Sequence, residues 1–160
     1  MGADMPEPKS WPDLAGRMVA DGEGGRHHVL PVRVYFEDTD FSGLVYHASY
    51  LRWCERGRSD YLRLVGNEHR ALIEGGDGAE PSAFVVRRMQ LEYLKPARID
   101  DVLEVETRVA EIRGAALRLA QRVVRGPTVL FEADVLVVLV SVSGKPQRLG
   151  QRLRASLAGG

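Results

Sequence analysis

Apolar residues follow two different periods along this chain, and the change of period predicts its secondary structure. Val32, Val34 and Phe36 alternate with Arg33 and Tyr35, which is typical of a half-buried strand. Further on, apolar and small residues recur at helical spacing, namely Tyr50, Cys54, Gly57, Tyr61 and Val65. We therefore predict a strand that ends near residue 36 and a helix over residues 50–65.

The second half of the chain alternates mostly with the period of strands. A glycine-rich run at residues 75–78 breaks the helical pattern. Four strand-like segments follow, at residues 83–93, 102–111, 117–123 and 131–141. We expect Arg118 and Arg122 of the third segment to pair with glutamates of the second. Residues 135–140 are apolar on both faces, which predicts a strand covered on both sides.

One helix and five strands joined by short turns predict an α+β fold, in which a five-stranded antiparallel sheet wraps around one long helix. The folded domain is expected over residues 28–150. Residues 1–27 carry three prolines and a Gly-Glu-Gly-Gly run, so we predict a disordered N-terminal tail. Residues 151–160 are predicted as a C-terminal tail. One helix leaves apolar sheet surface uncovered, so a second copy of the chain is expected to cover it.

The candidate chemistry lies between the first strand and the helix. Residues 37–40 read Glu-Asp-Thr-Asp, and His47 follows near the expected helix start. The first turn of a helix has backbone N–H groups without intrahelical partners, at the positive end of the helix dipole. We expect these N–H groups to face the same space as Asp40, with Gly43 allowing the turn. The residues alone do not separate Asp40 from Glu37 and Asp38, because short acidic side chains also accept backbone hydrogen bonds in turns.

The run from residue 35 to residue 51 resembles the hotdog-fold acyl-CoA thioesterases of the 4-hydroxybenzoyl-CoA thioesterase type. Within them it is similar to the branch associated with the Tol-Pal cell-envelope system. The similarity continues through residues 52–58, 84–87 and 93–101. It departs at Phe41 and Ser42, where the family more often has small residues. The resemblance implies a hotdog fold and hydrolysis of an acyl-CoA to the free acid and CoA, with no cofactor and no metal.

The resemblance also implies roles for individual residues. The family's catalytic acid corresponds to Asp40, which would act as general base or nucleophile. The helix start near His47 would be the oxyanion site, and we expect the His47 side chain to take part. The resemblance further implies a substrate-binding group and an acyl pocket formed between two subunits of a homodimer or homotetramer. Toward the acyl group it consists of Tyr46, which would line the pocket, of Gly43, and of Phe41, which would narrow the pocket. Lys95 and Arg98 would hold the CoA phosphates, with Arg87 and Arg88 as the alternatives.

Two other functions stay open at this point. A hotdog dehydratase is the rival enzyme, although its acidic and histidine residues follow a different pattern. A noncatalytic acyl-binding partner of cell-envelope or lipid-synthesis machinery is the rival of another class.

Composition narrows the choice of partners and compartment. The 22 basic and 22 acidic side chains leave no net charge, which disfavours a nucleic-acid partner. No apolar run is long enough for a membrane span, and residues 1–25 lack the apolar core of a secretory signal, so a cytoplasmic protein is expected. Cys54, the single cysteine, is expected to be buried rather than nucleophilic. His27 and His28 are expected at the surface or at a strand start rather than in a metal site.

Overall fold

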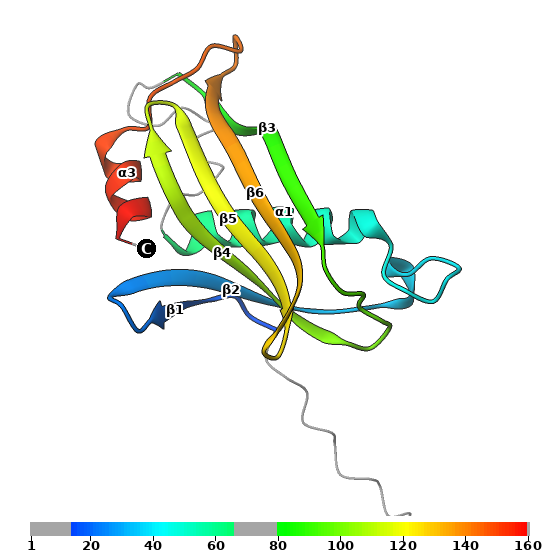
Figure 1. The fold of residues 1–160 in the computed structure, drawn as a ribbon. Coiled ribbons are helices and arrows are strands. Elements are labelled where there is room, and N and C mark those ends of the chain that lie inside the picture. Colours follow the sequence, from blue (N-terminus) through cyan, green and yellow to red (C-terminus); the bar gives the residue numbers. More distant parts are fainter. Residues whose placement is uncertain (1–13, 66–79, 160) are drawn as a thin grey trace, which may run out of the picture.

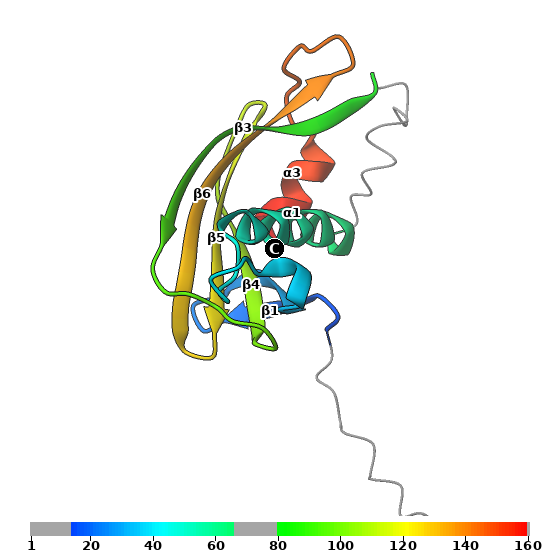
Figure 2. The same ribbon diagram turned by 90° about the vertical axis from the view of Figure 1, so that its right-hand side faces the viewer.

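The computed structural model describes residues 14–65 and 80–159. A curved antiparallel sheet wraps around the long helix α1, which lies on its concave face (Figures 1 and 2). The strand order is β1-β2-β4-β5-β6-β3, and all neighbouring strands run antiparallel. The elements are β1 (Arg17–Asp21), β2 (Gly25–Arg33), the 3-10 helix η1 (Phe36–Asp38), α1 (His47–Leu64), β3 (Ser82–Tyr93), β4 (Val102–Arg113), β5 (Ala116–Arg125), β6 (Thr128–Ser141) and α3 (Gln151–Ala158).

The predicted α+β class and the single long helix are confirmed, and the strand count differs. The sheet has six strands instead of five, because β1 pairs with β2 in a register from Arg17↔Val29 to Asp21↔Gly25. The strand expected to end near residue 36 ends at Arg33. Phe36 begins η1 instead, and its side chain is 81% exposed.

Part of each predicted tail is structured. Residues 17–21 form β1, and β2 already begins at Gly25, within the segment assigned to the N-terminal tail. The C-terminal segment forms α3, which buries Leu153 and Leu157. The tail prediction is therefore wrong for these residues. The remaining N-terminal residues 1–13 and the breaker at residues 75–78 lie outside the described residues.

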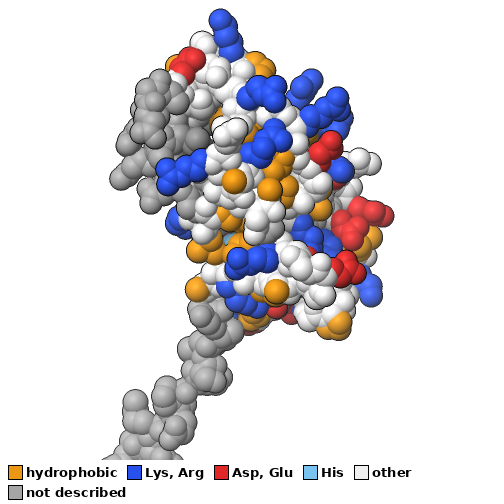
Figure 3. All heavy atoms as spheres, turned by 90° about the vertical axis from the view of Figure 1, so that its left-hand side faces the viewer, with side chains coloured by type: hydrophobic (Ala, Val, Ile, Leu, Met, Phe, Trp, Pro, Cys, Tyr) orange, Lys and Arg blue, Asp and Glu red, His pale blue; other side chains and the backbone are white. Residues whose placement is uncertain are grey.

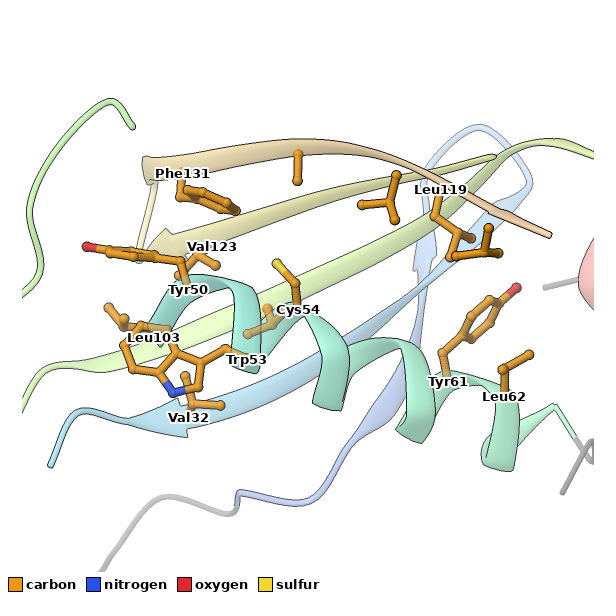
Figure 4. Close-up of a cluster of buried hydrophobic side chains, with 14 of the residues drawn as sticks. Val32, Tyr50, Trp53, Cys54, Tyr61, Leu62, Leu103, Leu119, Val123 and Phe131 are labelled. Carbon is orange, nitrogen blue, oxygen red and sulfur yellow. The ribbon is translucent and has the colours of Figure 1, made fainter. Parts of the chain in front are cut away.

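The core lies between α1 and the concave face of the sheet (Figure 4). Tyr50, Trp53, Cys54 and Tyr61 of α1 point into it and are at most 3% exposed. Gly57 allows the close approach, since a Cβ atom there would lie 3.1 Å from Val105 Cγ1. The prediction for Cys54 is confirmed: its side chain is fully buried, and burial raises the pKa of the thiol to about 12.

A buried polar network joins α1 to the sheet. The Gln121 amide nitrogen donates to the Cys54 carbonyl over 3.0 Å and to Thr107 Oγ1 over 2.8 Å. The Gln121 amide oxygen accepts from Arg58 Nη1 over 2.7 Å, and Arg58 also pairs with Glu55. Every polar group of this arrangement has a partner within it, so the network fixes how the helix lies on the sheet.

His27 and His28 lie near the start of β2, as one of the two predicted alternatives stated, and both are buried instead of lying at the surface. In the sheet register His28 lies between Met18 of β1 and Thr107 of β4, and His27 lies opposite Val19 of β1. His28 Nε2 lies 2.7 Å from Asp60 Oδ2 of α1. Within the described residues, no three His, Cys, Asp or Glu side chains gather as a metal-binding group.

Charges are mixed on the strands and unevenly spread elsewhere. Arg122 pairs with Glu106 at 2.6 Å and Arg118 with Glu111 at 3.7 Å, which confirms the predicted cross-strand pairing. The segment 142–159 differs, because it contains Lys145, Arg148, Arg152 and Arg154 and no acidic residue. Lys and Arg outnumber Asp and Glu on the face that carries α3 (Figure 3). No helix in the described part of the chain has the length and apolar character to span a membrane.

Candidate active site

The acidic loop forms a tight turn at the start of α1. Thr39 and Val45 pair as an isolated antiparallel bridge. Inside this bridge the Asp40 N–H donates to the Leu44 carbonyl and the Gly43 N–H donates to the Asp40 carbonyl, each over 3.0 Å. Gly43 has a φ of 80°, a conformation that residues with a Cβ rarely adopt, so its predicted role in the backbone turn is confirmed.

Asp38 holds this loop together, as its alternative role predicted. One carboxylate oxygen accepts the Tyr35 N–H over 2.9 Å. The Asp38 carbonyl accepts the Tyr46 N–H over 2.8 Å and the Ser49 hydroxyl over 3.2 Å. Asp38 therefore links the segment that follows β2 to the first turn of α1.

Asp40 is exposed on the same loop and carries a carboxylate at neutral pH. Its Oδ1 accepts the Ser42 hydroxyl and the Ser42 backbone N–H, the latter over 2.8 Å. These hydrogen bonds lower the pKa of Asp40 below its usual range, and the nearby His47 lowers it slightly further. The side chain is thus ionised and available to act as a base or a nucleophile.

The first turn of α1 offers unpaired backbone donors beside this loop. Tyr46, in extended conformation, caps the helix without a side-chain hydrogen bond. The Ser49 N–H donates to the Tyr46 carbonyl over 2.9 Å. The N–H groups of His47 and Ala48 have no acceptor among the residues that the structure describes. Such donors at a helix N-terminus suit an oxyanion.

The His47 side chain is exposed between two tyrosines. Its ring centroid lies 4.4 Å from that of Tyr46 and 6.4 Å from that of Tyr93. The Tyr93 hydroxyl donates to the His47 carbonyl over 2.9 Å. Tyr46 and His47 thus form one exposed aromatic surface at the helix start.

A second loop carries Lys95 and Arg98 to the acidic loop. The Val45 N–H donates to the Ala97 carbonyl over 3.0 Å, and Leu44 pairs with Arg98 as an isolated bridge. The side chains of Lys95 and Arg98 form no ion pair with another described residue. Arg87 and Arg88 lie in the middle of β3, roughly 17–20 Å from its Tyr93 end at about 3.3 Å per residue. The two predicted cation pairs are therefore at different places.

Within one chain the candidate site is an open surface. Phe41 is fully exposed, so it narrows no pocket of the single chain, and its predicted effect on the acyl pocket stays a prediction. The acidic loop lines neither the apolar cavity between α1 and the strands β3, β5 and β6 nor the groove across β3, β5 and β6.

Sequence reasoning missed two residues of this region. The contact of Ser42 with Asp40 has a local signal, since an aspartate often accepts a hydrogen bond from the residue two positions on. Tyr93 is 46 residues from His47 in the sequence, so no local pattern indicates their contact.

A sheet wrapped around a single helix, with an acidic loop at the helix start, defines the hotdog class of thioesterase folds. The chain belongs to the thioesterase superfamily, whose family model matches residues 42–132. The predicted resemblance and the predicted enzyme class, a thioester hydrolase, are thereby confirmed.

Individual relatives agree with this membership. The acyl-CoA thioester hydrolase YbgC of Escherichia coli O6:H1 is 47% identical over 127 residues, which are 78% of this chain and 91% of that protein. The acyl-CoA thioesterase YbgC of Haemophilus influenzae is 40% identical over 128 residues, 79% of this chain and 91% of that protein. The crystal structure of a probable thioesterase from Bartonella henselae has a TM-score of 0.74 at 43% identity, covering 78% of this chain and 99% of that one.

Proposed function

We propose that this protein hydrolyses an acyl-CoA to the free acid and CoA, with Asp40 as general base or nucleophile and the first turn of α1 as the oxyanion site. One observation carries the proposal: an ionised carboxylate lies on the loop that leads into a helix start with two unpaired N–H groups. The names of the two YbgC relatives support acyl-CoA as the substrate class.

The chemistry of a thioester fits these groups. A thiol has a pKa of about 8.5, so CoA leaves as a thiolate without a strong acid. The reaction then needs a nucleophile and donors for the oxyanion. Asp40 either attacks the thioester carbon itself or takes a proton from the water that attacks. If Asp40 attacks, an acyl-enzyme anhydride forms as the C–S bond breaks, and water then hydrolyses the anhydride to the free acid and the Asp40 carboxylate. If Asp40 acts as a base, water adds to the thioester carbon, the C–S bond breaks, and the proton taken by Asp40 returns to solvent. In both routes the carbonyl oxygen charge develops against the N–H groups of His47 and Ala48, and the CoA thiolate is protonated from solvent.

The neighbouring residues suggest how the substrate lies. Lys95 and Arg98 belong to a loop that contacts the acidic loop, and neither forms an ion pair within the described residues. We assign them to the CoA phosphates in preference to Arg87 and Arg88. Tyr46, Gly43 and Phe41 are assigned to the acyl side.

We further propose that the acyl pocket is completed by a second copy in a homodimer or homotetramer. β3 is an edge strand of 12 residues that pairs on one side with β6. Its Val85, Val86 and Tyr93 are each more than 40% exposed, and a long apolar edge is a ready surface for another chain. Sedimentation velocity tests this: a dimer or larger species is expected, and a stable, active monomer would contradict it.

The activity is tested by measuring CoA release from short-chain, long-chain and aromatic acyl-CoAs. Asp40→Asn should lower the rate about 10²- to 10⁴-fold, the usual effect of removing a general base. Glu37→Gln is the matched control, since it neutralises another exposed acid of the same loop and should retain the wild-type rate. Equally slow release by the wild type and Asp40→Asn with every acyl-CoA would favour a noncatalytic acyl-binding protein.

A further inference from the structure

Ser42 holds one oxygen of the Asp40 carboxylate with two donors. Its backbone N–H donates to Asp40 Oδ1 over 2.8 Å, and its hydroxyl donates to the same oxygen. The hydroxyl oxygen also accepts the Leu44 N–H over 3.3 Å. Because a hydroxyl has one proton, the Leu44 N–H on its oxygen leaves that proton directed at Asp40.

The other carboxylate oxygen stays free. Within residues 14–65 and 80–159, no donor forms a hydrogen bond to Asp40 Oδ2. The torsion that turns an aspartate carboxylate is broad and roughly two-fold, so an exposed carboxylate without such contacts would exchange its two oxygens readily. The hydrogen bonds from Ser42 therefore hold Oδ1 in place, and Oδ2 has no donor among the described residues.

We propose that Ser42 is a positioning residue for hydrolysis: it fixes Oδ1 of Asp40 and thereby presents Oδ2 to the thioester carbon or to the attacking water. This inference rests on the proposed role of Asp40.

Holding Oδ1 should have two measurable effects, on the basicity of Asp40 and on its orientation. The two hydrogen bonds from Ser42 are the leading causes that lower the pKa of Asp40, so they weaken it as a base while they orient it. Removing the hydroxyl should therefore raise the pKa of Asp40. It should also lower turnover at pH values where Asp40 is fully ionised, because the free oxygen is no longer fixed.

The test compares Ser42→Ala, which removes the hydroxyl, with Ser42→Thr, which keeps it. Asp40 is titrated directly by carbon-13 NMR of its carboxyl group in the full chain, with Asp40→Asn used for the assignment. We expect the Asp40 carboxyl in Ser42→Ala to titrate at higher pH than in the wild type, and in Ser42→Thr to titrate as in the wild type. The acid limb of kcat/KM should move to higher pH in Ser42→Ala, and its plateau kcat should fall by up to about tenfold.

The matched control is Ser156→Ala. Ser156 lies on α3, at the opposite end of α1 from the acidic loop, and its hydroxyl donates to the Arg152 carbonyl over 2.9 Å (Figure 1). This variant should change neither the titration nor the rate. An Asp40 carboxyl that titrates at the same pH in the wild type and Ser42→Ala would overturn the role of Ser42, whatever the activity. The role of Ser42 would also be overturned if the Asp40 carboxyl titrates at higher pH in Ser42→Ala while the acid limb of kcat/KM does not move, provided that Asp40→Asn is inactive. An active Asp40→Asn enzyme would instead refute the proposed function.

Discussion

The hydroxyl of Tyr93, the last residue of β3, donates a hydrogen bond of 2.9 Å to the backbone carbonyl of His47, the first residue of α1. The Tyr93 ring also packs against Phe131, with ring centroids 5.0 Å apart. The end of an edge strand thus holds the helix start whose N–H groups we assign to the oxyanion. If β3 pairs with a second subunit, this contact also connects the subunit interface to the reaction site.

Tyr93→Phe should lower turnover and leave the fold intact. The substitution keeps the ring in its packing against Phe131 and removes the hydrogen bond to His47. A single hydrogen bond has a net value of about 0.5–1.5 kcal/mol, so we expect kcat to fall roughly twofold to tenfold. Steady-state kinetics with one acyl-CoA measure this, and circular dichroism monitors the fold. A kcat equal to that of the wild type would show that the contact does not position the helix start.

His47→Ala should lower turnover by more than Tyr93→Phe. It removes the imidazole beside Asp40 and keeps the backbone N–H of the first helical turn. The side chain is exposed, so no loss of folding stability is expected. His47→Gln, which retains a hydrogen-bond donor, should recover part of the rate. Turnover of His47→Ala at the wild-type level would restrict His47 to its backbone contribution.

Removing Lys95 and Arg98 should weaken binding of CoA thioesters. If both cations contact the CoA phosphates, Lys95→Ala and Arg98→Ala should each raise KM for an acyl-CoA several-fold. The KM for the matching acyl-pantetheine, which lacks the nucleotide phosphates, should not change. Arg152→Ala, an exposed arginine of α3, is the control. Equal effects on both substrates would indicate a structural role for the loop, and an effect of Arg87→Ala alone would move the phosphate site to β3.

Much of this fold could be predicted because burial alternates where the sequence alternates. Leu103 and Val105 of β4 are fully buried, while Glu104 and Glu106, which alternate with them, are partly exposed. β1 gave no such signal, since three of its residues are only partly buried and two are exposed. β1 is held in the sheet by backbone pairing with β2, and such pairing produces no periodic pattern of apolar side chains.

The candidate site also has residues that the sequence could assign and residues whose positions it could not predict. Asp40 and His47 were assigned through a sequence motif, and the structure brings their loop to the helix start. The positions of Lys95 and Arg98 depend on bridges between segments more than 50 residues apart. Composition and spacing carry no information on such contacts, which arise from the register of the sheet.

Gln121→Leu should destabilise the protein strongly despite its similar volume. The buried Gln121 side chain serves Arg58, Thr107 and the Cys54 carbonyl, and leucine would leave them without these partners. A buried polar group without a partner costs about 1–3 kcal/mol, so we expect a loss of roughly 2–4 kcal/mol in the free energy of unfolding. Urea unfolding at a fixed protein concentration measures it. Gln151→Leu, an exposed position of α3, should change stability little, and similar values for both variants would contradict the role of the network.

Stability should fall below about pH 6.5 because of the buried histidines of β2. Burial lowers the pKa of His28, and the hydrogen bond from its ring to the Asp60 carboxylate opposes this only partly. Burial and the neighbouring Arg108 lower the pKa of His27. Near pH 6 the unfolded chain then binds more protons than the folded one, so acid favours unfolding. Above the unfolded pKa the histidines are neutral in both states, and stability levels off.

Urea unfolding between pH 5.5 and 8 measures the slope of the free energy of unfolding against pH. His28→Gln keeps a donor for Asp60 and should reduce the slope, with the remainder due to His27. An unchanged slope in His28→Gln would show that His28 does not link folding to pH.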